Sequence, residues 1–426
     1  MTGKGAAAPF CLPMTRRDHH PLHPPGSTAR RRLLLAGAAG AMLPLPAWPA
    51  DGAPGAAGLL LLLDDDGRRL AVVDAATLAL LQRWPLSGAV RGDPLFTPDG
   101  RSVLLGTRDG RITRHEPPDG RPTATVDTGG ELAAFALSSD GRWLLAAPAG
   151  TAGLALYDGD LRLVRRYPAA SLDGRTSPVA AVFDAGARRS FVVAFDSLRE
   201  LWEISYDRAA PPIFDGLVHD YRMGEAIASA GFLGVRRTPL ETPFTALALD
   251  GSQRHVLGIA PATPALEVIN LDVRRRIAQL AADVRSAAGL ARFASQGRPM
   301  LAVAGADAMV RIVDAAPWRV VRALPLPAPA VVLRTHAAAP QLWAGSRVGA
   351  GEAIFTLVEK ETLDIAGTVT LRGQLLGPTA FSADGQRLWV SMRRDGGDGL
   401  AVCSTGPPHD MRWLPTGRAP AAWPLP

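Results

Sequence analysis

The chain has 426 residues, 47% of them hydrophobic, and a formal net charge of +6. Residues 1–50 hold six basic residues and one acidic residue, so nearly all of the net charge belongs to this segment. The rest of the chain is close to neutral, which on charge grounds argues against nucleic acid as a partner. No window has the unbroken apolar length of a membrane-spanning helix, so we expect no membrane span.

Residues 1–57 are predicted to be an export leader and linker. Arg30, Arg31 and Arg32 precede an apolar run over 33–45, and small residues among prolines follow it. A basic segment, a short apolar run and small residues are typical of a signal peptide. Paired arginines directly before a modest apolar run indicate twin-arginine export, hence a periplasmic protein. The alternative is a basic tail with a chance apolar patch.

From residue 58 onward a short β unit recurs: a turn, polar residues, a β run, a second turn and another β run. The anchors of the repeat are Asp99, Asp140, Asp184, Asp250, Gly297, Pro340 and Asp384. Their spacings are 41, 44, 66, 47, 43 and 44 residues. A period of about 40–50 residues with several short strands per unit is typical of a β-propeller.

Seven anchored units and the unanchored segment 59–85 predict one all-β domain over 58–426, an eight-bladed β-propeller. Segment 59–85 lacks the strand that should precede its first turn. We expect the tail after Arg418 to supply that strand, because ring closure leaves no open sheet edge.

The 66-residue spacing marks an insert at about 213–240. It contains the polar and aromatic residues His219, Tyr221 and Arg222. One interpretation is a loop over the axial face that binds a ligand, with arginines suited to carboxylates. The other is a decorated loop that pairs its own charges and caps a blade.

Metal and nucleophile motifs are not apparent in the sequence. The many Asp-Gly pairs occupy turn positions that favour these residues for backbone reasons. The histidines after the leader form no metal-binding pair, so we expect no metal site built from side chains. With only Cys11 and Cys403 there is no Cys-x-x-Cys-His, hence no c-type haem. Arg334-Thr335-His336, at a strand end, either points into the central funnel or ends in a surface histidine.

Several stretches resemble the haem d1 propeller family, which includes the d1 domain of cytochrome cd1 nitrite reductase and its relatives in haem d1 biosynthesis. These stretches are 179–185 with 190–194, 201–206, 215–225, 268–275, 296–299 and 334–336. The resemblance covers about residues 58–417 and is strongest to the biosynthesis branch, the NirF-type proteins and the dihydro-haem d1 dehydrogenase. It implies an eight-bladed propeller in the periplasm with a non-covalent d1-type haem in the central funnel, held by basic side chains on its carboxylates.

The chain departs from the family at the histidines. The position of the proximal haem ligand reads Arg91, and the two substrate-side histidines fall near Thr245 and Ser286. Arginine is a poor iron ligand because it stays protonated. The resemblance therefore implies a funnel that holds a tetrapyrrole by its carboxylates, with Arg91, Arg175 and Arg222 as candidates.

The expected function is binding of a d1-type haem or its precursor in haem d1 biosynthesis or maturation of nitrite reductase. Nitrite reductase and other haem d1 maturation proteins are then the expected protein partners. Two alternatives stay open. One is a degenerate propeller without haem that acts as a protein-interaction module, and the other is a redox enzyme acting on dihydro-haem d1 or nitrite.

Overall fold

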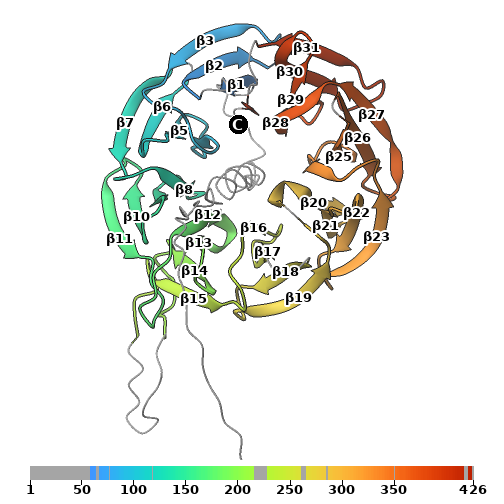
Figure 1. The fold of residues 1–426 in the computed structure, drawn as a ribbon. Helices are drawn as coiled ribbons and strands as arrows, with labels where there is room; N and C mark the ends of the chain where they lie inside the picture. Colours follow the sequence, from blue (N-terminus) through green and yellow to red (C-terminus); the bar gives the residue numbers. More distant parts are fainter. Residues whose placement is uncertain are drawn as a thin grey trace, which may run out of the picture.

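A computed structural model describes residues 58–424 except 64–66, 76, 118, 215–227, 261–264, 285, 350 and 417–420. The described residues form eight four-stranded antiparallel sheets around a common axis, which confirms the predicted eight-bladed β-propeller (Figure 1). Among these residues no helix has the length and apolarity to cross a membrane.

The strands of blades 1 to 4 are given from the axis outward. Blade 1 has β32 (Ala421–Pro424), β1 (Leu59–Leu63), β2 (Arg69–Asp74) and β3 (Leu80–Pro85). Blade 2 has β4 (Leu95–Phe96), β5 (Val103–Gly106), β6 (Arg111–Glu116) and β7 (Arg121–Asp127). Blade 3 has β8 (Leu132–Leu137), β9 (Trp143–Pro148), β10 (Gly153–Asp158) and β11 (Leu163–Pro168). Blade 4 has β12 (Val179–Ala185), β13 (Ser190–Phe195), β14 (Glu200–Ser205) and β15 (Val235–Pro239), with the short 3₁₀ segment η2 (Gly186–Arg188).

Blades 5 to 8 follow the same order. Blade 5 has β16 (Ala246–Leu249), β17 (His255–Ile259), β18 (Ala265–Asn270) and β19 (Arg275–Ala281). Blade 6 follows the 3₁₀ segment η3 (Ala287–Gly289) and has β20 (Leu290–Ser295), β21 (Arg298–Ala304), β22 (Met309–Asp314) and β23 (Arg319–Pro325). Blade 7 has β24 (Ala330–Arg334), β25 (Gln341–Val348), β26 (Glu352–Glu359) and β27 (Ile365–Arg372). Blade 8 has β28 (Gln374–Phe381), β29 (Arg387–Arg394), β30 (Gly397–Ser404) and β31 (Met411–Pro415).

The ring is closed by the two ends of the described chain. The C-terminal strand β32 pairs antiparallel with β1, from Leu60 opposite Pro424 to Leu63 opposite Ala421. It thereby supplies the inner strand that segment 59–85 lacks, as predicted. Leu61 is fully buried and Trp423 is nearly so, so both strands contribute apolar area to the closure.

The repeat anchors lie at the turn between the first and second strands of blades 2 to 8, except Asp184, which lies near the end of β12 just before that turn. In blade 8 the Ser382 hydroxyl donates to Asp384 Oδ1 at 2.5 Å, and the same oxygen accepts from Gln386 N at 3.0 Å. Gly385 then takes a φ of +70°, a conformation that glycine adopts without a steric penalty. The same bonds recur at Asp99 and Asp140. The recurring sequence is therefore a local turn code.

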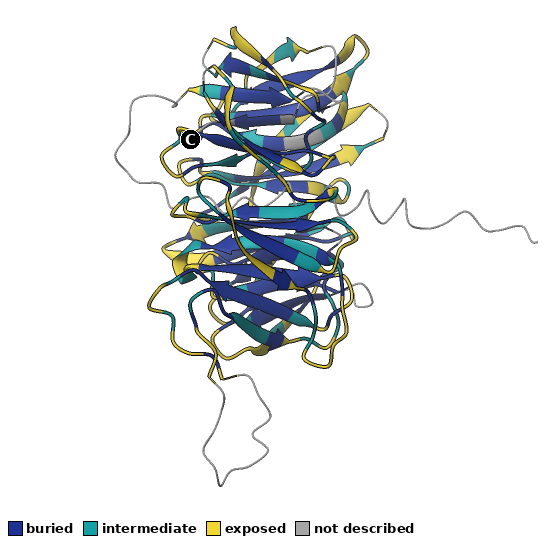
Figure 2. Cartoon of the chain, turned by 90° about the vertical axis from the view of Figure 1, so that its left-hand side faces the viewer, coloured by how far each residue is buried: buried dark blue, intermediate teal, exposed yellow. Residues whose placement is uncertain are grey.

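The apolar core is divided among the blade interfaces, with one cluster between each neighbouring pair of blades. Figure 2 shows the buried strands stacked in this way, with exposed residues concentrated on the outer strands and connections. Trp202, Trp343 and Trp389 are each at most 1% exposed and are packing residues of these clusters.

Because strands alternate in direction, the connections separate onto two faces. The crossover face carries the connections between blades and those between second and third strands, and Val90 N donates to Gly67 O where two of them meet. The hairpin face carries the connections between first and second strands and between third and fourth strands.

Candidate functional site

The connection from β3 to β4 brings a charged segment to the inner edge of blade 2. Val90 forms a bridge with Thr107, and the ladder resumes only at Leu95, opposite Leu104. Between these points Gly92 has a φ of +77°, and the chain leaves the ladder from Arg91 to Asp93. The segment that the family resemblance associates with the haem ligand is thus a bulge on the first strand of a blade, a common way to re-aim side chains.

Arg91 lies on the crossover face and links blades 2 and 3. Its Nη1 is 2.9 Å from Glu131 Oε1, and 25% of its side chain is exposed. Its backbone N donates to Gly106 O at 2.8 Å, which fixes the start of the bulge. The guanidinium has other N–H groups besides the one facing Glu131, so it can still contact a ligand carboxylate.

Arg175, Thr245 and Ser286 also lie in connections between blades, hence on the crossover face. Arg175 Nε donates to Asp173 Oδ2 at 2.8 Å within one exposed turn. The Thr245 hydroxyl donates to Ile259 O at 3.0 Å, and the Ser286 hydroxyl accepts from Ala288 N at 3.1 Å at the start of η3. These groups share a face with Arg91, and each already has a local partner.

His336 lies on the other face. It is in the connection from β24 to β25, on the hairpin face, and its ring packs against Phe381 with centroids 5.8 Å apart. Its backbone O accepts from Lys360 Nζ at 2.9 Å, and burial lowers the pKa of its imidazole. The structure therefore does not bring His336 together with Arg91, Arg175, Thr245 and Ser286.

His219, Tyr221 and Arg222 lie outside the described residues, as does all of 215–227. The described ends of the insert belong to the connection between β14 and β15, the two outer strands of blade 4, on the hairpin face. There Ile213 pairs with Ser229, and Leu233 O accepts from Tyr167 Oη of blade 3 at 3.0 Å. The described ends of the insert thus lie on the hairpin face, between outer strands, whereas Arg91 lies on the crossover face.

Two further charged residues, Asp93 and Arg334, are not among the predicted site residues. Asp93 lies just before the inner strand β4, and Arg334 is the last residue of the inner strand β24. Trp423 Nε1 donates to Asp93 Oδ1 at 3.1 Å, whereas Oδ2 is shielded from solvent and has no partner. Burial raises the pKa of Asp93, opposed by the Trp423 hydrogen bond and the charge of Arg334. Burial lowers the pKa of Arg334 to about 10, opposed by the charge of Asp93. A sequence signal was present, because Arg334 ends the otherwise apolar strand β24.

The four described histidines do not lie on inner strands. His115 is on β6, His255 is on β17, and His336 and His409 are in hairpin-face connections. His115 stacks on Trp84, and His255 binds Asp250 at 3.0 Å, so both serve the blades themselves. Among the described residues no cluster of His, Cys, Asp and Glu is arranged to hold a metal ion. The described donors suit the carboxylates of a tetrapyrrole, and they offer its iron no histidine at the axis.

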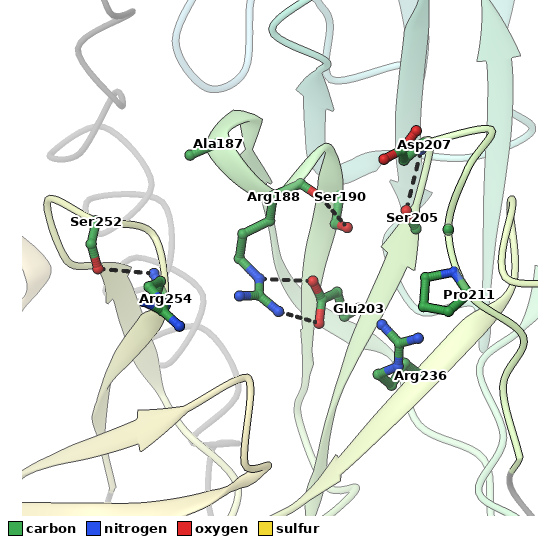
Figure 3. Close-up of a pocket in the computed structure, with 11 residues that line it drawn as sticks. Ala187, Arg188, Ser190, Glu203, Ser205, Asp207, Pro211, Arg236, Ser252 and Arg254 are labelled. Atoms are coloured by element: carbon green, nitrogen blue, oxygen red, sulfur yellow. Dashed lines mark hydrogen bonds and ion pairs between the residues drawn. The ribbon is translucent and has the colours of Figure 1, made fainter.

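A separate pocket of about 360 Å³ lies between blades 4 and 5 (Figure 3). Arg188 fills one side of it and binds Glu203 through two bonds of 2.8 and 3.2 Å. Arg188 also binds Asp272 at 2.6 Å, and Asp272 binds Arg254. Most of the charged side chains that line the pocket are already paired, so we interpret it as a structural feature of the blade interface.

Comparisons with known proteins agree with the fold. Residues 55–216 match the model of the cytochrome D1 heme domain family. The dihydro-heme d1 dehydrogenase of Pseudomonas aeruginosa is 27% identical over 365 residues, which cover 84% of this chain and 69% of that protein. The solved structure of the dihydro-heme d1 dehydrogenase NirN in complex with DHE superposes with a TM-score of 0.73 at 26% identity. That match covers 89% of this chain and 78% of the other. The chain is therefore similar in sequence and in fold to the haem d1 propeller family, as the sequence resemblance predicts.

Proposed function

We propose that this protein binds a d1-type haem or its precursor non-covalently at the axis of the propeller, in haem d1 biosynthesis or the maturation of nitrite reductase. The observation that carries the proposal is a set of charged side chains on or next to inner strands: Arg91 and Asp93 lead into blade 2, and Arg334 ends the inner strand of blade 7. Arg91 is partly exposed on the crossover face, and Asp93 and Arg334 keep unused hydrogen-bonding capacity. The similarity to a protein whose solved complex contains DHE supports the choice of ligand.

In this proposal the chain supplies binding and orientation. Guanidinium groups bind carboxylates through two parallel hydrogen bonds, which fixes the plane of the ligand as well as its position. The tetrapyrrole would supply the redox chemistry of its ring and iron. Arg91 and Arg334 are the described residues that we propose to meet its carboxylates.

Titration of the purified protein with haem d1, followed by absorption spectroscopy, tests the proposal. We expect a saturable spectral shift at micromolar protein, and a weaker response to protohaem as the control ligand. If haem d1 and dihydro-haem d1 both leave the spectrum unchanged, the protein is not a haem d1 carrier, and the interaction-module alternative gains.

A second candidate function is dehydrogenation of dihydro-haem d1. The similarity to a dihydro-heme d1 dehydrogenase favours it. The reaction removes two electrons and two protons from the macrocycle, so the assay must contain an electron acceptor such as ferricyanide. Conversion of the dihydro-haem d1 spectrum into that of haem d1, faster than without protein, would support this activity. Binding without conversion would support the carrier function and argue against the dehydrogenase activity.

Export through the twin-arginine route to the periplasm belongs to the same proposal, with nitrite reductase and other haem d1 maturation proteins as partners. It is supported by Arg30, Arg31 and Arg32 before the apolar run. Replacing all three with lysine should retain the protein in the cytoplasm, as measured by cell fractionation. Normal export of that variant would show that the arginines are not the signal.

A further inference from the structure

We propose that His255, Asp250 and Asn270 form a proton-operated switch that controls an ion-pair tie between blades 4 and 5 on the hairpin face. While His255 is neutral, the switch holds the tie in place. When His255 takes up a proton, the contact with Asn270 is lost and the tie loosens. This behaviour is independent of any ligand at the axis of the propeller.

The contacts of Asp250 place a proton on one ring nitrogen of His255. Asp250 Oδ2 lies 3.0 Å from His255 Nδ1 and accepts from the Ser252 hydroxyl at 2.6 Å. Asp250 Oδ1 accepts from the backbone N of His255 at 2.9 Å. A carboxylate that is surrounded by donors acts only as an acceptor, so His255 Nδ1 carries a proton.

The contacts of Asn270 leave the other ring nitrogen without a proton. Asn270 Oδ1 accepts from the backbone N of Asp272 at 2.8 Å and from that of Val273 at 3.1 Å. Asn270 Nδ2 is then the atom that lies 3.2 Å from His255 Nε2. Because an amide nitrogen only donates, Nε2 accepts this bond. His255 is therefore neutral, with its proton on Nδ1.

A second proton on His255 has opposite effects on its two partners. It strengthens the contact with Asp250, which becomes a charge-assisted pair. It removes the contact with Asn270, because two N–H donors then face each other. Asn270 can accept from Nε2 only if its Oδ1 turns away from the backbone of Asp272 and Val273. The neutral and the protonated histidine therefore require different arrangements of Asn270.

Asp272 connects the switch to blade 4. Its Oδ1 accepts from Arg188 Nη1 of blade 4 at 2.6 Å, and its Oδ2 accepts from Arg254 Nε at 2.7 Å. The bond to Asn270 fixes the backbone of Asp272, so the loss of that bond weakens the contact with Arg188. Arg188 and Arg254 also line the pocket between the two blades (Figure 3), so protonation would alter the wall of the pocket.

The remaining neighbours of His255 leave Asp250 as the charged group bonded to its ring in the described part of the chain. Trp318 of blade 6 meets the ring edge-on, with centroids 5.2 Å apart, and carries no charge. Arg292 of blade 6 lies behind Asp250 and donates to its backbone O at 3.1 Å. The side chain of His255 is 17% exposed, so water can deliver a proton to it.

Hydrogen exchange of the full-length protein, followed by NMR, tests the switch. The reporters are the backbone amides of Asp272 and Val273, corrected for the intrinsic effect of pH on exchange. We expect their protection to fall about tenfold between about pH 7.5 and about pH 5.5, because histidine ordinarily takes up a proton in this range. The internal control is the same kind of turn in blade 3, where Asp158 Oδ1 accepts from the backbone N of Asp160 at 3.0 Å and of Arg162 at 2.9 Å. Their protection should not fall.

Two variants remove the response for different reasons. Asn270→Asp keeps an oxygen for the turn and offers its second oxygen to protonated Nε2, so protection of the two amides should persist at the lower pH. His255→Gln does not titrate, and it should also remove the dependence on pH. Agreement between the two variants separates the switch from a general loss of packing at position 255.

A double-mutant cycle tests the link to blade 4. Arg188→Gln, Asp272→Asn and the double variant are compared by urea denaturation at the same two pH values. We expect a coupling of about fivefold in the unfolding equilibrium constant at the higher pH and little coupling at the lower pH. Effects of pH on the rest of the molecule cancel in the cycle.

Three results would overturn the switch. One is a ring NMR spectrum at the higher pH that places the proton on His255 Nε2. Another is a loss of protection at Asp272 and Val273 that matches the control turn or persists in His255→Gln. The third is a coupling between Arg188 and Asp272 that does not change with pH. Since none of these measurements uses haem, they stand apart from the test of the proposed function.

Discussion

The indole Nε1 of Trp423 donates a hydrogen bond of 3.1 Å to Asp93 Oδ1 and thereby joins the last strand of the propeller to the proposed site. Trp423 lies on β32, the strand that closes blade 1, and Asp93 precedes the first strand of blade 2. Ring closure and site geometry are thus coupled through one side-chain contact.

Substitutions at Trp423 should separate these two roles. Trp423→Ala should destabilise the protein by about 3–5 kcal/mol, because it removes a nearly fully buried side chain from the closure. Trp423→Phe retains most of the apolar packing and should cost only about 1 kcal/mol for the lost hydrogen bond. Urea denaturation measures both. Equal losses for the two variants would show that the bond to Asp93, not the packing, holds the closing strand.

Arg91 and Glu131 give a pair of opposite predictions for ligand binding. Arg91→Ala should weaken haem d1 binding about tenfold, because one charge-assisted contact is lost. Glu131→Gln should strengthen binding, since it frees Arg91 from its partner at 2.9 Å. The control is Arg162→Ala, a 78% exposed arginine on the hairpin face that pairs with Asp160. Absorption titrations measure the three affinities, and unaltered binding in both Arg91 and Glu131 variants would remove Arg91 from the site.

Asp184 should make stability depend on pH between about 4 and 7. Burial raises the pKa of its carboxyl group to about 7, and Tyr206 Oη donates to its Oδ1 at 2.7 Å. The folded protein then holds a proton that the unfolded chain releases above its ordinary pKa of 3.8, so stability falls as the pH rises through this window and levels off above it. The slope for one proton is at most about 1.4 kcal/mol per pH unit.

Asp184→Asn isolates this contribution, because the amide oxygen can still accept from Tyr206 and does not titrate. As the pH rises from 4 to 7, the unfolding free energy of the wild type should fall relative to that of the variant. Urea denaturation at several pH values measures it. A difference that stays constant over this range would mean that Asp184 is ionised in the folded protein throughout.

Two turn glycines with similar backbone conformations test whether His336 is a packing residue. Gly385 has a φ of +70° and a Cβ there would collide with His336 Nδ1, whereas Gly297 has a φ of +74° and open space. Gly297→Ala should cost about 1–2 kcal/mol for the left-handed conformation alone. Gly385→Ala should cost more, and the additional change His336→Ala should recover the excess.

The same variants bear on ligand binding. His336→Ala alone should leave haem d1 affinity unchanged, because His336 lies on the face opposite Arg91. Thermal denaturation and absorption titration provide the two readouts. Equal losses for the two glycine variants, or a drop in affinity for His336→Ala, would contradict this assignment.

The architecture could be predicted from the sequence because its determinants are local. Each Ser/Thr-x-Asp-Gly turn is built by bonds within about five residues, as at Asp384, so the pattern repeats visibly along the chain. The missing inner strand of blade 1 was also predictable, since a ring of sheets must close. The excess length near 213–240 was visible in the spacing for the same reason, although Val235–Pro239 within that range form β15, the regular outer strand of blade 4.

The candidate site was predictable only in part. Arg91 could be selected through its family position, but the sequence does not state which residues share a face. His336 and the ends of the insert fall on the hairpin face because of the strands that they connect. Asp93 and Arg334 are far apart in the sequence and belong to blades 2 and 7. Trp423 reaches Asp93 only after the ring has closed, so only the tertiary structure decides what surrounds these two charged side chains.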